Sequence, residues 1–198
     1  MRLPAAERRR QIIETAAQLF SRKGFSGTTT RELAQAAGVS EATLFKHFAT
    51  KEELYAAIIE AKAQTRRILD TVLQAAERKD DAEVLRILAT ELIGRTTADP
   101  TLMRLMFFSA LEGHALSEIF FRSRVEAIDR FLGQYIAERV AAGAFRALEP
   151  MQAAWNFIGM VAFHIQMREL FGQKNATASG DEVAVREMVS LFLEGIRA

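Results

Sequence analysis

The chain has 198 residues, of which 49% are hydrophobic and 26% are charged, and it contains no cysteine. This composition is typical of a globular protein with a substantial core, and the lack of cysteine excludes disulfides, thiolate metal sites and cysteine nucleophiles and fits a cytoplasmic location. The net charge of +1 hides nine basic and four acidic side chains in residues 1–51, so this segment carries +5 and the remainder −4, which indicates a polyanionic partner or, alternatively, a merely solvated face.

The residue types and the spacing of apolar positions predict an all-α fold. Prolines occur only at positions 4, 100 and 150, helix formers are abundant, and apolar residues recur every three or four positions without a sustained period of two. Glycine 24, 38 or 143 ends a helix at each of three places. The expected helices, about nine in number, span residues 6–23, 30–37, 40–48, 51–77, 81–97, 100–112, 118–142, 150–172 and from 181 onward, with a turn at 114–117 and a polar loop at 173–180.

The longest stretch without Asp, Glu, Lys or Arg covers residues 150–167. It reaches only the short limit for a membrane-spanning helix, and Asn156, His164 and Gln166 within it would be costly in lipid. The N-terminus lacks the apolar run of a signal peptide. We therefore expect a buried helix here and no membrane association.

The two short helices around Gly38 predict a helix-turn-helix. Small Ala34 lies four residues before this glycine and lets the helices cross closely, and Gly38 can adopt the left-handed conformation of a sharp turn. Val39 and Leu44 can then hold the pair at a fixed angle. In a helix-turn-helix the second helix enters the major groove of DNA. The same spacing also occurs in helical hairpins with other roles, so the surrounding residues matter.

Those surroundings resemble the signature of the TetR family of one-component repressors over about residues 8–58. An alanine-rich first helix ends in F-x-x-x-G-[FY], and then come T-[ST], I-A-x-x-A-G-V-S, a block ending in [HY]-F, and K-E-x-L. The matching residues are Ile12, Ala17, Phe20, Gly24, Phe25, Thr28, Thr29, Leu33, Ala34, Ala37, Gly38, Val39, Ser40, Thr43, Leu44, Phe45, His47, Phe48, Lys51, Glu52 and Leu54.

The resemblance implies which residues contact DNA. The helix from Ser40 would be the recognition helix, four positions usually hold phosphates, and Arg31 and Lys46 are among those suited to base edges. Where the family usually has tyrosine this chain has Phe45, which either packs against bases and sugars or loses a phosphate contact. The basic run 8–10 is either a DNA-binding arm or a solvated end. The expected phosphate ligands are Thr29, Thr43, His47 and Lys51, and the remaining expected DNA contacts are Thr30, Arg31, Ser40, Glu41, Ala42, Phe45 and Lys46.

The resemblance also implies two domains. An N-terminal three-helix helix-turn-helix DNA-binding domain would cover residues 1–50, and a C-terminal helical ligand-binding and dimerisation domain would cover residues 51–198. One recognition helix reads too few bases, so such proteins pair, and the last two helices have more apolar residues than one buried face needs. An intramolecular core is the alternative. The expected dimer contacts are Ala154, Ile158, Ala162, Gln166, Val185, Val189, Phe192 and Ile196.

A small-molecule effector site in the C-terminal domain is a further implication of the resemblance. The methionine and aromatic side chains of this domain suit apolar, variable ligands, although such stripes are more often plain core. An ordinary core histidine with a satisfied hydrogen bond also explains His164. The expected ligand contacts are Met103, Met106, Phe107, Leu111, Phe120, Phe121, Trp155, Met160, Phe163, His164 and Met167.

Together these features predict a ligand-responsive DNA-binding transcriptional regulator. It would be a repressor that binds a palindromic double-stranded DNA operator as a homodimer and is released by a small, largely apolar effector, through a shift of the long helix from Lys51. An architectural or nucleoid factor with the same DNA-binding head and no ligand control is one alternative. A helical-bundle enzyme is the other, but the sequence has three histidines and no Glu-x-x-His pair, G-x-S-x-G or P-loop. We expect no catalytic residue, cofactor or metal.

Overall fold

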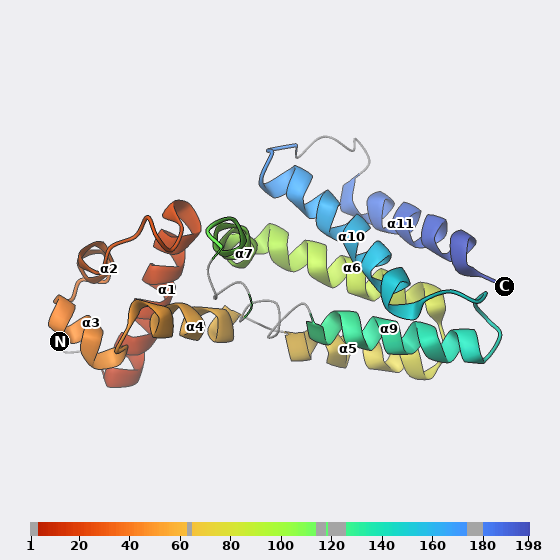
Figure 1. The fold of residues 1–198 in the computed structure, drawn as a ribbon, viewed down its shortest axis with the longest axis horizontal. Coiled ribbons are helices and arrows are strands. Elements are labelled where there is room, and N and C mark those ends of the chain that lie inside the picture. The colour runs from red at the N-terminus through yellow and green to blue at the C-terminus, as the bar shows by residue number, and fades with distance from the viewer. Residues whose placement is uncertain (1–3, 63–64, 114–117, 119–125, 174–179) are drawn as a thin grey trace. The chain divides into compact units, whose positions relative to one another are not determined.

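Figure 1 shows a computed structural model of the chain, which describes residues 4–62, 65–113, 118, 126–173 and 180–198. Within these ranges there is no β-strand, and the only bridge is an isolated antiparallel one between Phe145 and Arg197. The predicted all-α fold class is therefore confirmed. The contacts between residues divide the chain into two compact units. The first unit consists of Met1–Ala63 and Pro100–Arg124, and the second consists of Gln64–Asp99 and Val125–Ala198.

The first unit is built around its N-terminal helix. That helix packs against the second, fourth and seventh helices, and the second packs against the third. Its buried residues include Ile12, Ala16 and Phe20, which are four positions apart, in line with the apolar spacing on which the helix prediction rests. The helices described in this unit are α1 (Ala5–Lys23), α2 (Thr30–Ala36), α3 (Glu41–His47), α4 (Lys51–Lys62) and α7 (Thr101–Leu111).

An aromatic cluster joins α1, α4 and α7. The rings of Phe20 and Phe25 stack with their centroids 5.6 Å apart, and Tyr55 meets them edge-on at 5.4 and 5.6 Å. The Tyr55 hydroxyl donates to the carbonyl of Leu105 in α7 at 2.8 Å, and burial raises the pKa of Tyr55 to about 12. The contacts place α4 and α7 in the same unit as the helix-turn-helix, and the functional boundary at residue 50 stays a prediction.

The second unit has α6 at its centre. This helix packs against α5, α10 and α11, and α10 packs against α9. Leu88, Leu132 and Phe157 are fully buried in the core that these helices share. The side chain of Asp80 caps α6 and that of Glu149 caps α10, each by accepting a backbone N–H three residues later. The helices described in this unit are α5 (Thr65–Glu77), α6 (Asp81–Ala98), α9 (Glu126–Ala141), α10 (Pro150–Glu169) and α11 (Gly180–Ile196).

The predicted helix ends agree with the structure to within a few residues in most places. The predicted helix 51–77 corresponds to α4 and α5, with residues 63–64 outside the described ranges, and the predicted helix 118–142 is described from 126 to 141. The turn predicted at 114–117 also lies outside the described ranges. Helix α10 ends three residues earlier than predicted. No helix in the described part of the chain combines the length and apolar character that crossing a bilayer requires.

Candidate nucleic-acid interface

A capping box fixes the start of α2 and ties it to α1. The Thr29 hydroxyl accepts the backbone N–H of Glu32 at 3.2 Å, and the Glu32 carboxylate accepts the backbone N–H of Thr29 at 2.9 Å. The same carboxylate accepts the ammonium of Lys23, at the end of α1, at 2.6 Å. Chiefly because of the hydrogen bond from Lys23, and also because of those from Thr29, the pKa of Glu32 falls to about 2.

The corner between α2 and α3 is a complete Schellman motif. Val39 N–H donates to the carbonyl of Ala34 at 2.9 Å, and Gly38 N–H donates to that of Gln35 at 3.1 Å. Gly38 has φ of +65°, a conformation that glycine adopts without the steric penalty of a side chain. Ala34 and Ala37 are buried beside the corner. The glycine corner that the sequence predicts is therefore present with its full set of hydrogen bonds.

Helix α3 has one buried side and one exposed side. The Ser40 hydroxyl caps it by accepting the backbone N–H of Thr43 at 3.1 Å. Leu44 of α3 is buried, and so is Phe48, which directly follows the helix. These inward anchors leave Glu41, Ala42, Phe45 and Lys46 exposed, while Thr43 and His47 are partly buried. An exposed side of this kind is what the insertion of a recognition helix into a groove requires.

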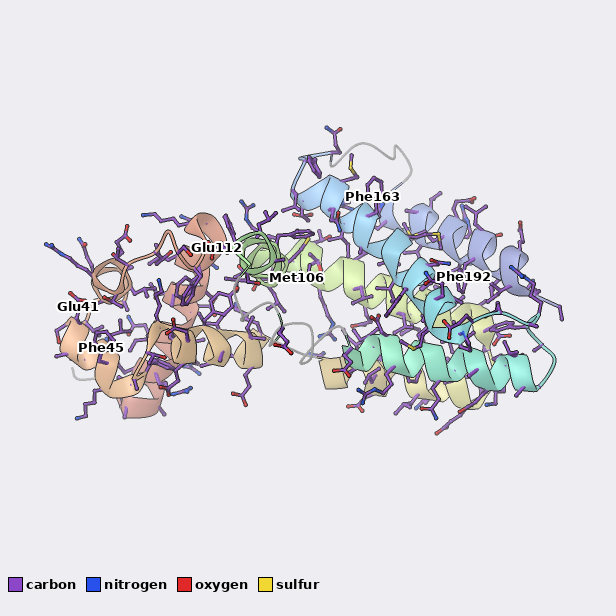
Figure 2. The ribbon with its side chains drawn as sticks, viewed as in Figure 1. Glu41, Phe45, Met106, Glu112, Phe163 and Phe192 are labelled. Atoms are coloured by element: carbon purple, nitrogen blue, oxygen red, sulfur yellow. The ribbon has the colours of Figure 1, made fainter. Side chains whose placement is uncertain are left out.

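The exposed side of α3 presents a mixture of charged and apolar groups. Glu41, Ala42, Phe45 and Lys46 are all exposed, and both labelled residues of this side, Glu41 and Phe45, project from α3 in Figure 2. The Glu41 carboxylate accepts the hydroxyl of Thr30, from α2, at 2.7 Å. The aromatic ring of Phe45 is 44% exposed.

Two cations on this surface are free to meet phosphates or bases. Arg31 on α2 and Lys46 on α3 are exposed, and neither forms an ion pair or side-chain hydrogen bond within the described ranges. Arginine and lysine are the usual partners of phosphate oxygens and of guanine edges. The arrangement therefore combines exposed cations with a rigid short helix.

Lys51 has a structural task in addition to its predicted phosphate contact. Its ammonium donates to the carbonyls of Phe25 at 2.8 Å and Thr28 at 3.0 Å, and it lies 4.1 Å from the centroid of the Phe25 ring. An ammonium has three N–H groups, so one remains for a phosphate. The guanidinium of Arg9 likewise lies 4.6 Å from the centroid of the Phe48 ring, which holds part of the basic run 8–10 against the helix-turn-helix.

The residues predicted to contact DNA lie on α2, on α3, directly before these helices or, for Lys51, at the start of α4, while their contacts with DNA stay predictions. The support that α7 gives to this surface could not be predicted from the sequence. Arg104 of α7 donates to the carbonyl of Ser21 at 3.0 Å, and Glu112 accepts the backbone N–H of Ser26. No pattern within α7 indicates these partners, because they lie far away in the sequence.

The residues predicted for the dimer interface lie on α10 and α11, and several of them are covered by their own chain. The ring centroids of Phe192 and Phe157 are 5.1 Å apart within the core. Ile158, Ala162 and Gln166 are partly exposed. The buried members of the predicted set are Ala154, Val185, Val189, Phe192 and Ile196.

Other side chains of α10 and α11 provide exposed apolar area. Trp155 is 50% exposed, Phe163 62% and Leu191 64%. Trp155 is nevertheless oriented, because its indole N–H donates to the buried carboxylate of Asp129 at 3.0 Å. These exposed side chains are available for apolar contacts with a partner chain. The dimer interface itself stays a prediction.

The residues predicted to bind a ligand fall into both units. Met103, Met106, Phe107 and Leu111 lie on α7, while Phe120 and Phe121 lie outside the described residues. The remaining five, Trp155, Met160, Phe163, His164 and Met167, lie on α10. Their role in ligand binding stays a prediction.

His164 has a partner within its own unit. Its Nε2 lies 3.2 Å from a carboxylate oxygen of Asp181, which also contacts the guanidinium of Arg168. A hydrogen-bond partner within the same unit is what the alternative interpretation of His164, as an ordinary core histidine, requires. A groove of about 410 Å³ opens between α10 and α11, and Met160 is the predicted ligand residue that lines it.

Two short helices that meet at a glycine corner, each with an exposed cation and the second with an exposed aromatic ring, define a helix-turn-helix DNA-binding protein. The comparisons with known proteins agree. The model described as bacterial regulatory proteins, tetR family, matches residues 12–58, and that of the AefR-like transcriptional repressor C-terminal domain matches residues 83–195. The chain belongs to the TetR family of transcriptional regulators, which confirms the resemblance stated from the sequence.

Three similar proteins illustrate the range of this family. The nucleoid occlusion factor SlmA of Vibrio vulnificus (strain YJ016) is 35% identical over 117 residues, 56% of this chain and 54% of SlmA, and the chain thus spans about half the length of the first curated relatives it matches. The flavonoid-responsive regulator FrrA is 28% identical with a TM-score of 0.67, covering 98% of both chains. AibR, solved in complex with isovaleryl coenzyme A and operator DNA, is 26% identical with a TM-score of 0.68, covering 93% of this chain and 97% of AibR.

Proposed function

We propose that this chain is a ligand-responsive transcriptional repressor of the cytoplasm that binds a palindromic double-stranded DNA operator as a homodimer. The observation that carries the proposal is the exposed side of α3, with Phe45 and Lys46 facing solvent while Leu44 is buried. A helix held in this way fits the major groove. The proposal assigns no catalytic residue, cofactor or metal.

Salt-dependent binding to DNA tests the proposal directly. The probe is the intergenic DNA upstream of the gene, in which a mobility-shift assay with the full chain is expected to locate an inverted repeat. Replacing Arg31 or Lys46 with alanine should weaken binding and reduce the slope of log affinity against log salt by about 1 per lost phosphate contact. Arg78→Ala is the matched control, because Arg78 is exposed on the second unit. Absence of salt-sensitive binding to any duplex would contradict the proposal.

The effector is proposed to be a small, largely apolar molecule bound in the C-terminal domain. Helices α7 and α10 each carry methionine and aromatic side chains, which suit apolar ligands. Two similar regulators also support the proposal: FrrA is named as flavonoid-responsive, and AibR was solved with isovaleryl coenzyme A. Operator and ligand then favour different conformations, so each lowers the affinity for the other. Flavonoids and isovaleryl coenzyme A are the first probes, and a ligand that binds without changing operator affinity would contradict this part.

Dimerisation is proposed to occur through α10 and α11. Trp155, Phe163 and Leu191 supply the exposed apolar area, and pairing two recognition helices is what a palindrome requires. Leu191→Arg is expected to shift the full chain from dimer to monomer in analytical ultracentrifugation. It should also weaken operator binding while leaving the helical content unchanged.

One observation favours a second candidate function. The match to SlmA, a nucleoid occlusion factor, supports a DNA-binding nucleoid factor without ligand control. Such a protein would occupy many dispersed chromosomal sites and show no effector response. A chromatin-immunoprecipitation map with one or a few strong sites near the chain's own gene would favour the repressor instead.

A further inference from the structure

Two side chains on the exposed face of α3 have chemistry that matches particular bases. Glu41 and Phe45 are four residues apart, so they project from the same face of the helix, one turn apart. We infer that these two residues determine the sequence of the operator half-site, with Glu41 selecting a cytosine through its amino group and Phe45 selecting a thymine through its methyl group. The inference rests on the proposed function, because it requires α3 to enter the major groove.

The carboxylate of Glu41 is held in place and still has accepting capacity. Thr30 donates its hydroxyl to Oε2 of Glu41 at 2.7 Å, which ties the side chain to α2. Within the described ranges Glu41 forms no ion pair, although Lys46 lies on the same short helix. One carboxylate oxygen, and the second lone pair of the other, therefore remain to accept hydrogen bonds.

An anionic group on a surface that faces DNA is unfavourable unless it meets a donor. In the major groove, the bases donate only through the amino groups of cytosine and adenine. Adenine presents the acceptor N7 beside its amino group, which repels a carboxylate, whereas cytosine presents its amino group without a neighbouring acceptor of its own. Glu41 therefore favours cytosine and disfavours the other three bases at one position.

Phe45 is apolar and exposed, and the packing of its own unit does not require a phenyl ring at this position. Leu44 and Phe48 already anchor this part of the chain in the core, and Phe45 is 44% exposed. Among the described residues of the first unit, Leu111 is the other exposed large hydrophobic residue. A phenyl ring has no donor for a phosphate, and the methyl group of thymine is the apolar group that the major groove offers. Thymine is therefore the base that Phe45 fits.

The helix geometry sets the spacing of the two bases. Four residues of α-helix advance by about 6 Å, and successive base pairs are about 3.4 Å apart. The selected cytosine and thymine should therefore lie within about two base pairs of each other, and the pair should recur in inverted orientation in the second half-site.

A selection from a random double-stranded DNA library with the full-length chain provides the first test. The wild-type chain should enrich a half-site with a cytosine and a thymine at this spacing. Glutamine pairs with the N6 and N7 atoms of adenine, so Glu41→Gln should replace the enriched cytosine with adenine and leave the thymine unchanged. Glu60→Gln is the control, because Glu60 is an exposed carboxylate of the same unit on α4. A change of preferred base cannot arise from a loss of folded protein.

The second test removes one methyl group from the DNA and leaves the protein unaltered. Deoxyuridine in place of the selected thymine should weaken wild-type binding about fourfold, as expected for the loss of one buried methyl group. Phe45→Ala should bind the thymine operator more weakly than wild type does and should show no further loss with deoxyuridine. Phe45→Leu, which keeps an apolar contact, should retain part of the methyl effect.

The outcomes separate this inference from the function on which it rests. If the wild type enriches a palindrome with salt-sensitive affinity but Glu41→Gln keeps the cytosine and Phe45→Ala keeps the methyl effect, the base assignment is overturned and the DNA-binding function stands. If no duplex is enriched at all, both fail. A switch from cytosine to adenine together with loss of the methyl effect supports the assignment.

Discussion

The carboxylate of Glu112, at the end of α7, accepts the backbone N–H of Ser26, 86 residues earlier in the chain, with its two oxygens at 3.2 and 3.3 Å. Both residues belong to the first unit, and Figure 2 shows Glu112 on α7. Ser26 lies between α1 and α2, three residues before the cap of α2. Helix α7 thus fixes the segment that leads into the helix-turn-helix.

Replacing Glu112 with glutamine should loosen this segment. An amide oxygen can still accept a hydrogen bond, but it loses the charge that strengthens a bond to a backbone N–H. Because the contact is exposed, we expect a loss of no more than about 1 kcal/mol in the free energy of unfolding and faster hydrogen exchange of the Ser26 amide. Exchange measured by mass spectrometry on peptides that cover residues 24–29 checks this, with Glu60→Gln as the control. Unchanged exchange in that peptide would show that the contact is unimportant.

Gly24 should be intolerant of a side chain for a related reason. It has φ of +75° and ψ of 176°, a region that is essentially restricted to glycine, and an added Cβ would lie 2.2 Å from Oε1 of Glu112. Gly24→Ala should therefore lower the free energy of unfolding by roughly 1–3 kcal/mol and displace the carboxylate.

The same substitution at Gly94 provides a control with the opposite sign. Gly94 lies within α6, and a Cβ built there meets nothing within 4 Å. Alanine is the better helix former, so Gly94→Ala should raise the free energy of unfolding by up to about 1 kcal/mol. Thermal melts of both variants measure these changes. Equal shifts in melting temperature for the two variants would refute the role given to the conformation of Gly24.

The helix-turn-helix could be predicted from the sequence because its determinants are local. Ser40 caps the helix that follows it, and the hydrogen bonds around Gly38 join residues at most five positions apart. The pattern of such residues is therefore legible within a short window. The family resemblance then added the roles of Arg31 and Lys46, which no local pattern supplies.

Contacts between distant segments could not be predicted in this way. The sequence gives α7 an apolar character, but nothing in α7 indicates that Glu112 meets Ser26 or that Arg104 meets Ser21. Apolar periodicity on α11 likewise identifies a face that must be covered, yet it does not distinguish a partner chain from the chain's own core. In the structure, Phe192 on that face packs within the core.

The ion pair between Glu32 and Lys23 predicts a pH dependence of stability. The pKa of Glu32 falls from 4.5 to about 2, chiefly through the hydrogen bond from Lys23. A carboxyl group whose pKa is lower in the folded state stabilises that state fully above pH 4.5, and this contribution is lost as the pH falls from 4.5 to about 2.

Glu32→Gln isolates this contribution. Glutamine at this position retains the capping box with Thr29 but does not titrate, so the variant should be less stable than wild type at pH 6. The difference should shrink as the pH falls toward 2. Urea titrations at pH 6, 4 and 3 measure it, and a difference that is independent of pH would contradict the assignment. Glu60→Gln again serves as the control.

The contacts of Asp81 should stabilise the second unit. Its carboxylate accepts the Tyr135 hydroxyl at 2.6 Å and two N–H groups of Arg139 at 2.8 and 2.9 Å, which joins α6 to α9. The side chains of Asp81 and Arg139 are only 16% and 17% exposed, so Asp81→Ala leaves two poorly hydrated donors without their acceptor. We expect it to lower the free energy of unfolding by about 2 to 3 kcal/mol.

The matched control for Asp81 is an ion pair on the same helix. Arg86 forms two hydrogen bonds to Glu83, at 2.6 and 2.7 Å, but the pair is solvent-accessible. Exposed ion pairs contribute little because both groups are well hydrated when apart, so Arg86→Ala should cost less than about 1 kcal/mol. The chain's single tryptophan, Trp155, lies in the second unit, and its fluorescence therefore reports the unfolding of that unit in urea. Equal losses for the two variants would show that the contacts of Asp81 with Tyr135 and Arg139 add nothing beyond an ordinary surface pair.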